Sequence, residues 1–317
     1  MNHQDVLRGI FSFDNVNVRL LMKTIALNPS LSVSHLIQGM MNVTRERFSP
    51  KEVMELITHR LDHGITTFDT AQIYGLGDNE KLIGEALNLN PSLKQSTQWI
   101  TKTGINYPKH STDIWHYDTR YQSIIHACES SLNHLGLNHI DIYLIHREDP
   151  LIDHESCAKA LDECVNRGYI RSYGVSNFDP IKFDALQSHT QHPLVTNQIE
   201  YHLDCFEHID NGNFDVFQKH RIHPLIWSPL AQGRLMRSQD LEYQKLRQTV
   251  LDLAEKHHTS PEGIALAFVM HHPSQPVPII GTTQASRCEH LIESTNIILD
   301  HQDWYKLYTA HPQRRLR

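Results

Sequence analysis

Four polar residues of the sequence stand where a catalytic group could be assembled. Asp69 ends a short run of β-branched and aromatic residues that begins at Ile65 and is typical of a buried strand. Tyr74 lies on the loop that follows, and Lys102 and His146 each close a further apolar run. Because the carboxyl ends of successive parallel strands meet at one face of a barrel, we expect these four side chains to form one active centre.

The chemistry of these residue types favours proton transfer to an oxygen. A tyrosine phenol has an ordinary pKa near ~10, too high for efficient acid–base work at neutral pH. A nearby ammonium lowers that pKa, so we expect Lys102 to tune Tyr74 and Asp69 to hold Lys102 in place. His146 could donate a hydrogen bond to a substrate oxygen or relay a proton. Such a group suits protonation of a carbonyl oxygen while hydride reaches its carbon, whereas no nucleophile for acyl transfer is evident. Each side chain taken alone is more often structural, and only their shared placement supports catalysis.

The rest of the chain repeats a strand followed by a helix. The first helix shows clear start signals, with Ser49 at the N-cap, Pro50 at the next position and Glu52 two residues later, and Gly64 stops it. Eight such units predict an α/β protein whose parallel strands close into a (β/α)8 TIM barrel. The expected strands span residues 36–40, 65–69, 98–102, 140–145, 170–175, 194–199, 223–228 and 276–280. The expected helices include 210–220 after the sixth strand and 240–257 after the seventh.

We expect a single domain over residues 1–317, because no Pro-, Gly- or Ser-rich linker divides the chain. The barrel would span about 34–295 and include extra helices. A short N-terminal hairpin over 11–27 would precede it, and a C-terminal extension, 296–317, would pack across one end.

Composition describes an ordinary soluble globular chain. Of its 317 residues, 21% are charged and 39% hydrophobic, and the net charge of -7 argues against nucleic-acid binding. We expect neither a signal peptide nor a membrane span, because no apolar run approaches ~18 residues. The 5 cysteines include no Cys-x-x-Cys pair, which predicts reduced structural thiols in a cytoplasmic protein.

The 24 histidines do not predict a metal site. None stand in the His-x-His pattern of metal-dependent barrel hydrolases, which disfavours that class. His59 and His63 could share one face of a helix, but no carboxylate or cysteine stands out as a third ligand. We therefore expect no bound metal.

Four linked motifs then give a more specific indication. They read FDTAxxYG from 68 with NExxIGxAL from 79, SLxxL from 131 with IDIYLIH from 140, GYIRxxGVSNF from 168, and WSPLAxGRL from 227. In this order the set resembles the signatures of the aldo-keto reductase family over nearly the whole chain. The segments HRxDP from 146 and PIIG from 278 are similar to those of the YdhF-type bacterial oxidoreductases.

The resemblance implies a nicotinamide cofactor bound in extended form across one end of the barrel, and hydride transfer to an aldehyde or ketone. Tyr74 would be the proton donor, tuned by Lys102 and Asp69, and His146 would orient the carbonyl. The expected cofactor-binding residues are Gly39, Met40, Ser176, Asn177, Gln198, Trp227, Ser228, Leu230, Gly233, Leu235, Gly281, Thr282, Thr283, Gln284 and Arg287.

These cofactor positions imply different roles. Ser176, Asn177 and Gln198 would hold the carboxamide, which needs both donors and acceptors. Trp227 stands where the family stacks an aromatic ring on the nicotinamide, although a core tryptophan is an alternative. The loop that begins at Ser228 would admit the pyrophosphate through small residues and backbone N–H groups.

The expected site for a 2′-phosphate departs from the family pattern. Many members have Lys-Ser where this chain has Gly281 and Thr282, and Leu291 replaces an adenine-binding Asn. Arg287 falls at the family's phosphate-binding arginine and could form a bidentate pair. NADPH is therefore favoured over NADH.

The main hypothesis is an NADPH-dependent reductase of small or aromatic aldehydes or ketones, acting as a monomer or a small homo-oligomer. The alternative is a cofactor-binding redox sensor or regulatory subunit with little turnover, as in potassium-channel β subunits of the same family. The substrate pocket should come from loops after the strands, including 107–117, where Trp115 and Tyr117 could supply aromatic walls.

Overall fold

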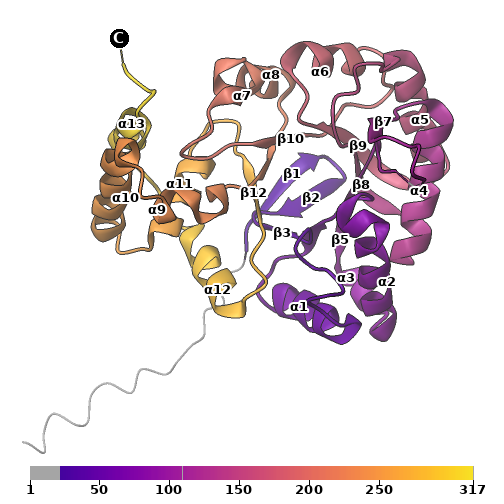
Figure 1. The fold of residues 1–317 in the computed structure, drawn as a ribbon, viewed down its shortest axis with the longest axis horizontal. Helices are drawn as coiled ribbons and strands as arrows, with labels where there is room; N and C mark the ends of the chain where they lie inside the picture. Colours follow the sequence, from indigo (N-terminus) through magenta and orange to yellow (C-terminus); the bar gives the residue numbers. More distant parts are fainter. Residues whose placement is uncertain (1–21, 109, 317) are drawn as a thin grey trace, which may run out of the picture.

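Eight parallel strands form a closed barrel in a computed structural model that describes residues 22–108 and 110–316. The strands follow one another around the barrel in the order β10-β11-β12-β3-β4-β5-β8-β9, so each is paired on both sides (Figure 1). Their bounds are β3 Ile37–Gly39, β4 Thr67–Asp69, β5 Gln98–Thr103, β8 Ile140–Ile145, β9 Ile170–Ser176, β10 Asn197–Glu200, β11 Leu225–Trp227 and β12 Val277–Ile280. The predicted (β/α)8 barrel is confirmed.

Helices surround the barrel, and most of the longer ones bury an apolar stripe toward the strands. Side-chain N-caps start several of them, and Ser49 and Glu52 form the predicted capping box at the first. The helices are α1 Pro50–Asp62, α2 Asn79–Leu89, α3 Leu93–Ser96, α4 Tyr121–Leu135, α5 His154–Asn166, α6 Pro180–Gln187, α7 Glu207–Asp210, α8 Asn213–His220, α9 Arg234–Arg237, α10 Gln244–Lys256, α11 Pro261–Met270, α12 Ala285–Ser294 and α13 His301–Ala310.

Two helical regions differ from the sequence prediction. A single helix over 210–220 was expected, but Gly212 adopts φ 87 and separates α7 from α8. The helix expected over 240–257 begins as a short 3-10 turn, Leu241–Tyr243, before α10. None of the helices in the described ranges is long and apolar enough to cross a membrane.

An antiparallel hairpin closes one end of the barrel. Its strands are β1 Thr24–Asn28 and β2 Leu31–Ser34. Leu27, Leu31 and Val33 pack in one apolar cluster with residues of the barrel strands, and the hairpin covers the barrel centre in Figure 1. The hairpin predicted over 11–27 lies mostly outside the described residues, and the observed hairpin begins at Thr24 because its apolar side chains fill the barrel mouth.

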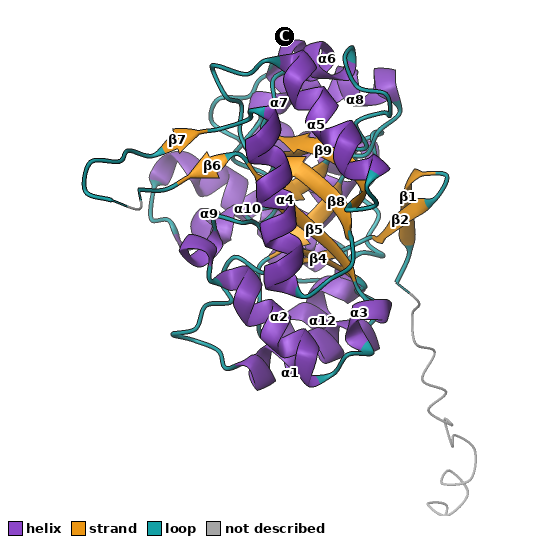
Figure 2. Ribbon diagram, turned by 90° about the vertical axis from the view of Figure 1, so that its right-hand side faces the viewer, coloured by secondary structure: helices purple, strands orange, loops and turns teal. Residues whose placement is uncertain are grey.

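The opposite end of the barrel carries a second hairpin, which stands on the far side from β1 and β2 in Figure 2. Its strands are β6 Ile105–Asn106 and β7 His116–Tyr117. Trp115 and Tyr117 are exposed there, and the Trp115 ring lies 6.3 Å from that of Tyr107. Because the first hairpin blocks one mouth, this end is the accessible one, and it is where the carboxyl ends of the strands open.

Candidate active site

The structure brings the four predicted catalytic side chains together at this open end. Nζ of Lys102 lies 2.7 Å from Oδ2 of Asp69 and 3.3 Å from the hydroxyl of Tyr74. The ring of His146 meets that of Tyr74 edge-on, with centroids 5.9 Å apart. The centre therefore consists of a buried ion pair, a phenol and an imidazole in mutual contact.

The strands fix these groups because each comes from the last residues of its strand or from the loop after it. Asp69 ends β4, and Lys102 lies near the end of β5. His146 directly follows β8 and donates its backbone N–H to the carbonyl of Thr103, 2.8 Å away. Tyr74 begins a short 3-10 turn, Tyr74–Gly77, which carries its ring back over the barrel mouth.

Asp69 has a second partner that links it to the far side of the barrel. Its Oδ1 accepts a hydrogen bond of 2.8 Å from Nε2 of Gln198 on β10. Lys102 also donates to the carbonyl of Thr70, 2.8 Å away. The two carboxylate oxygens are thus used on different partners, and the ammonium is held from two sides.

Two motif residues beside the centre are structural. Nδ2 of Asn79 donates to the carbonyl of Met40 at 2.9 Å, which ties the loop after β3 to the start of α2. Glu80 is buried and accepts from the hydroxyl of Thr101 at 2.6 Å. These bonds join the elements that carry Asp69 and Lys102.

Burial and charge act in opposite directions on the central pair. Burial raises the pKa of Tyr74, and the Lys102 ammonium lowers it without overcoming the burial, so the net pKa lies above the ordinary value. Burial lowers the pKa of Lys102, but the Asp69 carboxylate and Tyr74 outweigh it and raise the net pKa. The expectation of an acidified phenol was therefore wrong for the protein without ligands. Tyr74 stays protonated, and Lys102 stays charged.

His146 is held in its neutral form. Burial, followed by the charges of Lys102 and Arg147, lowers its pKa well below the ordinary value. Its Nδ1 is buried and has no hydrogen-bond partner among the residues that the structure describes. The neutral imidazole can exchange a hydrogen bond with a ligand oxygen only through its other nitrogen, Nε2, which makes no hydrogen bond within the described chain.

Arg147 belongs to the site, although the sequence analysis did not assign it a role. Its guanidinium lies 5.9 Å from the ring centroid of Trp227, and its charge also lowers the pKa of His146 after burial and Lys102. It is half-buried, and its position directly after His146 was the only signal that could have found it.

The residues expected to hold a carboxamide form a second network next to the centre. Nε1 of Trp227 donates to Oδ1 of Asn177 at 2.9 Å, and Nδ2 of Asn177 donates to the hydroxyl of Ser176 at 2.7 Å. Ser176 in turn donates to the carbonyl of Gln198. Asn177 has φ 60, a conformation that costs energy in most residues and often occurs at ligand sites. Trp227 is half-buried, so it is not the core tryptophan of the alternative interpretation.

The loop after β11 turns repeatedly in left-handed conformations. Ser228, Ala231 and Gln232 have φ of 51, 49 and 53, and Gly233 has φ 72. Successive turns of this kind direct backbone N–H groups toward one side, which suits an anion. The Leu235 side chain is buried in the apolar core, so it supports this loop instead of lining it.

Gly39 and Met40, the predicted cofactor-binding residues at the end of β3, could contact a cofactor only through their backbone atoms. A methyl group on Gly39 would lie 3.0 Å from Cγ2 of Ile279, so the residue allows close packing of β3 against β12. The Met40 side chain is fully buried in the cluster beneath α1 and α2. Their strand-end position was predictable, whereas the direction of the Met40 side chain was not.

The buried side chain of Arg60 holds the loop after β12 by a hydrogen bond. Arg60 on α1 donates to Oε1 of Gln38 at 2.6 Å and to the carbonyl of Thr282 at 3.0 Å. Arg287, near the start of α12, is exposed and makes no hydrogen bond or ion pair with any part of the chain that the structure describes. The exposed loop residues Gly281 and Gln284 lie between them, with Thr283 half-buried.

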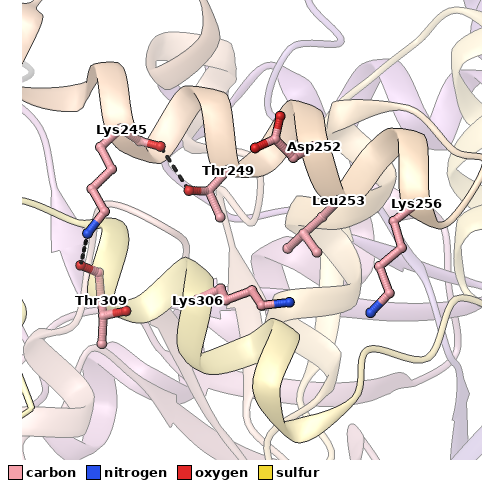
Figure 3. Close-up of a pocket in the computed structure, with 7 residues that line it drawn as sticks. All are labelled: Lys245, Thr249, Asp252, Leu253, Lys256, Lys306 and Thr309. Carbon is pink, nitrogen blue, oxygen red and sulfur yellow. Dashed lines mark hydrogen bonds between the residues drawn. The ribbon is translucent and has the colours of Figure 1, made fainter.

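A surface depression between α10 and α13 is a different feature. Figure 3 shows its lining by Lys245, Thr249, Asp252, Leu253, Lys256, Lys306 and Thr309. Its lysines are partly paired, since Asp303 lies 2.6 Å from Lys256 and 3.1 Å from Lys306. It lies on outer helices, away from the strand ends, and we do not assign it to the chemistry.

A protonated phenol beside a charged lysine and a neutral histidine, at the open end of a (β/α)8 barrel, defines a class of proton-transfer centres that act on a polar carbon–oxygen bond. Comparison with known proteins makes this class specific. A sequence model described as the Aldo/keto reductase family matches residues 35–310. The chain belongs to that family.

Individual relatives agree along nearly the whole chain. The 6-dehydroglucose reductase of Agrobacterium fabrum is 36% identical over 292 residues, which cover 91% of this chain and 97% of that protein. The oxidoreductase YdhF of Escherichia coli K12 is 35% identical over 279 residues, covering 87% and 93%. The crystal structure of the thermostable aldo-keto reductase Tm1743 with the inhibitor epalrestat aligns with a TM-score of 0.78 at 25% identity, covering 91% of this chain and 100% of that one.

Family membership makes the protein an NAD(P)H-dependent oxidoreductase that acts on small-molecule carbonyl compounds. The names of these relatives, a reductase and an oxidoreductase, favour an enzyme over the sensor alternative.

Proposed function

We propose that the protein reduces aldehyde or ketone carbonyls with NADPH and that Tyr74 donates the proton. The observation that carries this proposal is the position of the Tyr74 hydroxyl, 3.3 Å from a lysine that Asp69 and the Thr70 carbonyl hold in place. When bound, the reduced nicotinamide supplies hydride to the carbonyl carbon. Proton donation to the oxygen must then come from the protein.

The protonation states of the three titratable groups support carbonyl reduction. Tyr74 remains protonated at neutral pH because burial raises its pKa, so it can donate without a preceding protonation step. Lys102 favours the phenolate that remains after the transfer, since its charge lies within hydrogen-bond distance. His146, which is neutral, can orient the carbonyl oxygen toward the phenol through its Nε2.

The residues present fit a nicotinamide dinucleotide. The partly accessible ring of Trp227 and the left-handed turns from Ser228 to Gly233 support binding across the barrel mouth. Ser176, Asn177 and Gln198 would hold the carboxamide, and Leu230 and Thr282 would border the phosphate-bearing half. No metal ion is needed for this reaction.

A preference for NADPH follows from the free guanidinium of Arg287. It is exposed and unpaired among the described residues, so a 2′-phosphate can form a bidentate pair without breaking an existing bond. NADH lacks the 2′-phosphate, so its ribose offers no negative charge to Arg287. Thr283 and Gln284 can add neutral hydrogen bonds.

Substitution of Tyr74 by Phe tests the proposal. The rate of carbonyl reduction should fall by about 10²–10⁴, the usual contribution of a general acid, while NADPH still binds. Single-turnover and steady-state rates on a panel of aldehydes and ketones measure this effect, and the name of the Agrobacterium relative makes 6-dehydroglucose a first compound to include.

The matched control is Tyr169→Phe, which removes a hydroxyl that contacts Glu129 at 3.3 Å far from the site. It should keep the full rate. If Tyr74→Phe also keeps most of its rate, Tyr74 is not the proton donor. If the wild type retains NADPH but turns over none of the panel, the sensor alternative gains support instead.

A further inference from the structure

A second cluster of chemically active side chains lies on the outside of the barrel, where α1 meets α12. It consists of His59 in the last turn of α1, His63 at the C-cap of that helix, and Glu289 on α12. Nε2 of His59 lies 3.1 Å from Oε1 of Glu289, and Nε2 of His63 lies 3.7 Å from the same oxygen. The two imidazole rings stack with centroids 4.3 Å apart, so both present their Nε2 edges to one carboxylate.

These separations match the edges of a metal polyhedron. Zinc binds histidine and carboxylate ligands at about 2.0–2.1 Å, so two ligand atoms of a tetrahedral site lie about 3.3 Å apart. The observed 3.1 and 3.7 Å fall on either side of that value. Two histidines and a carboxylate, with water in the fourth position, form one of the common zinc ligand sets.

His63 is already oriented as a ligand. Its Nδ1 lies 2.8 Å from the carbonyl of His59, to which it can donate. This bond leaves the unprotonated Nε2 facing Glu289, as in histidine ligands whose second nitrogen is held by a backbone carbonyl.

His59 needs one change before it can bind. Its Nδ1 lies 2.9 Å from a guanidinium nitrogen of Arg60, which can only donate, so the proton of the neutral ring sits on Nε2. Metal binding at Nε2 requires this proton to move to Nδ1, and Arg60 must then turn from the ring. Arg60 keeps two other acceptors, Gln38 and Thr282, so the turn does not leave it unpaired.

The other candidate cluster in the described chain, Glu200, His202 and Cys205, is less suitable. Both ring nitrogens of His202 are engaged, Nδ1 by the backbone N–H of Asp204 and Nε2 by Glu200. Burial raises the pKa of Cys205 to about 11, so its thiol is protonated at neutral pH and is a poor ligand.

We propose that His59, His63 and Glu289 form a binding site for a zinc-type divalent cation that joins α1 to α12. The side chains are 26%, 36% and 46% exposed, so an ion can reach them from solvent. Sequence reasoning paired the two histidines but lacked the third ligand, which lies 230 positions from His59 along the chain. The site is separate from the proposed reduction, which needs no metal.

Isothermal titration of the full-length protein with zinc chloride, without reducing thiols, tests the proposal. One ion should bind, and the melting temperature should rise and return to its starting value after EDTA is added, because a ligand that binds only the native state stabilises it. His63→Gln and Glu289→Gln should each weaken binding by about tenfold or more, as expected when a ligand or its support is lost. Magnesium, which prefers oxygen ligands, should not compete.

His290→Gln is the matched control on the same exposed turn of α12, and Cys205→Ser is the control for the other cluster. Both should bind zinc as the wild type does. Absence of saturable binding by the wild type would overturn the proposal. Binding that survives both His63→Gln and Glu289→Gln would do the same, because it would place the ion elsewhere.

Discussion

Substitution of Asp69 by Asn isolates the ion pair at the centre of the site. Lys102 is fully buried, and its ammonium is paired with a carboxylate whose side chain is 5% exposed. Removing one partner of a buried pair costs about 3–5 kcal/mol, because the other charge is left without compensation. The Thr70 carbonyl still accepts from Lys102, and the Gln198 amide can rotate to suit the new side chain. We therefore expect the free energy of unfolding to fall by the lower end of this range, about 3 kcal/mol at pH 7.

The loss should depend on pH because the variant removes the main cause that raises the pKa of Lys102. Burial, which lowers that pKa, then dominates in the native state. The unfolded variant binds more protons than the native one below the ordinary lysine pKa, so native stability rises with pH by up to about 1.4 kcal/mol per unit. In the wild type the Lys102 pKa is raised. Its contribution to the free energy of unfolding therefore stays constant until the pH exceeds the ordinary lysine pKa. The difference in the free energy of unfolding between the wild type and Asp69→Asn should therefore become smaller from pH 7 to 9.5.

Urea unfolding at pH 7, 8 and 9.5 measures both effects. Asp303→Asn is the matched control, because it also removes a buried carboxylate paired with lysines. Lys256 and Lys306 are 46% and 55% exposed, so water can solvate them and the deficit of the control should not narrow with pH. A deficit below about 1 kcal/mol for Asp69→Asn, or one that stays constant with pH, would refute the description of Lys102 as a buried charge held by Asp69.

Two further predictions concern the cofactor and the imidazole. Arg287→Ala should weaken NADPH by at least about tenfold and leave NADH nearly unchanged, since one charge-assisted bidentate pair is lost, and equal weakening in fluorescence titrations would show that Arg287 does not bind the 2′-phosphate. The reduction rate should show no histidine titration as the pH falls through 6.5, because burial and the charges of Lys102 and Arg147 keep His146 neutral. A step near pH 6.5 in the pH–rate profile that disappears in His146→Gln would contradict this assignment.

The barrel and the catalytic contacts could be predicted because both follow from local patterns. Apolar runs that end in a polar residue identify strand ends, and closure of eight strands brings those ends to one face. Asp69 and Lys102 lie on neighbouring strands, so their contact followed from strand order alone. The direction of the Tyr74 pKa did not follow, because it depends on how much protein surrounds the phenol, and that quantity is not visible in the sequence.

Contacts between distant segments were also beyond prediction. Closure of the barrel makes α1 and α12 neighbours, but it does not show that Glu289 of α12 meets His59 and His63 at the end of α1. The direction of the Met40 side chain could not be predicted for a related reason. At a strand end the backbone faces the mouth, while the side chain can point inward or outward according to the local pleat.

In the proposed function, the two oxygens of Asp69 link cofactor binding to acid–base chemistry. One oxygen faces the lysine that acts on the phenol, and the other faces Gln198, which we assign to the carboxamide. Redesign of position 198 for another dinucleotide would therefore alter the reactivity of the phenol as well. Directed evolution of cofactor choice in this scaffold should begin instead at the distant phosphate end with Arg287, whose exposed side chain makes no hydrogen bond within the described chain.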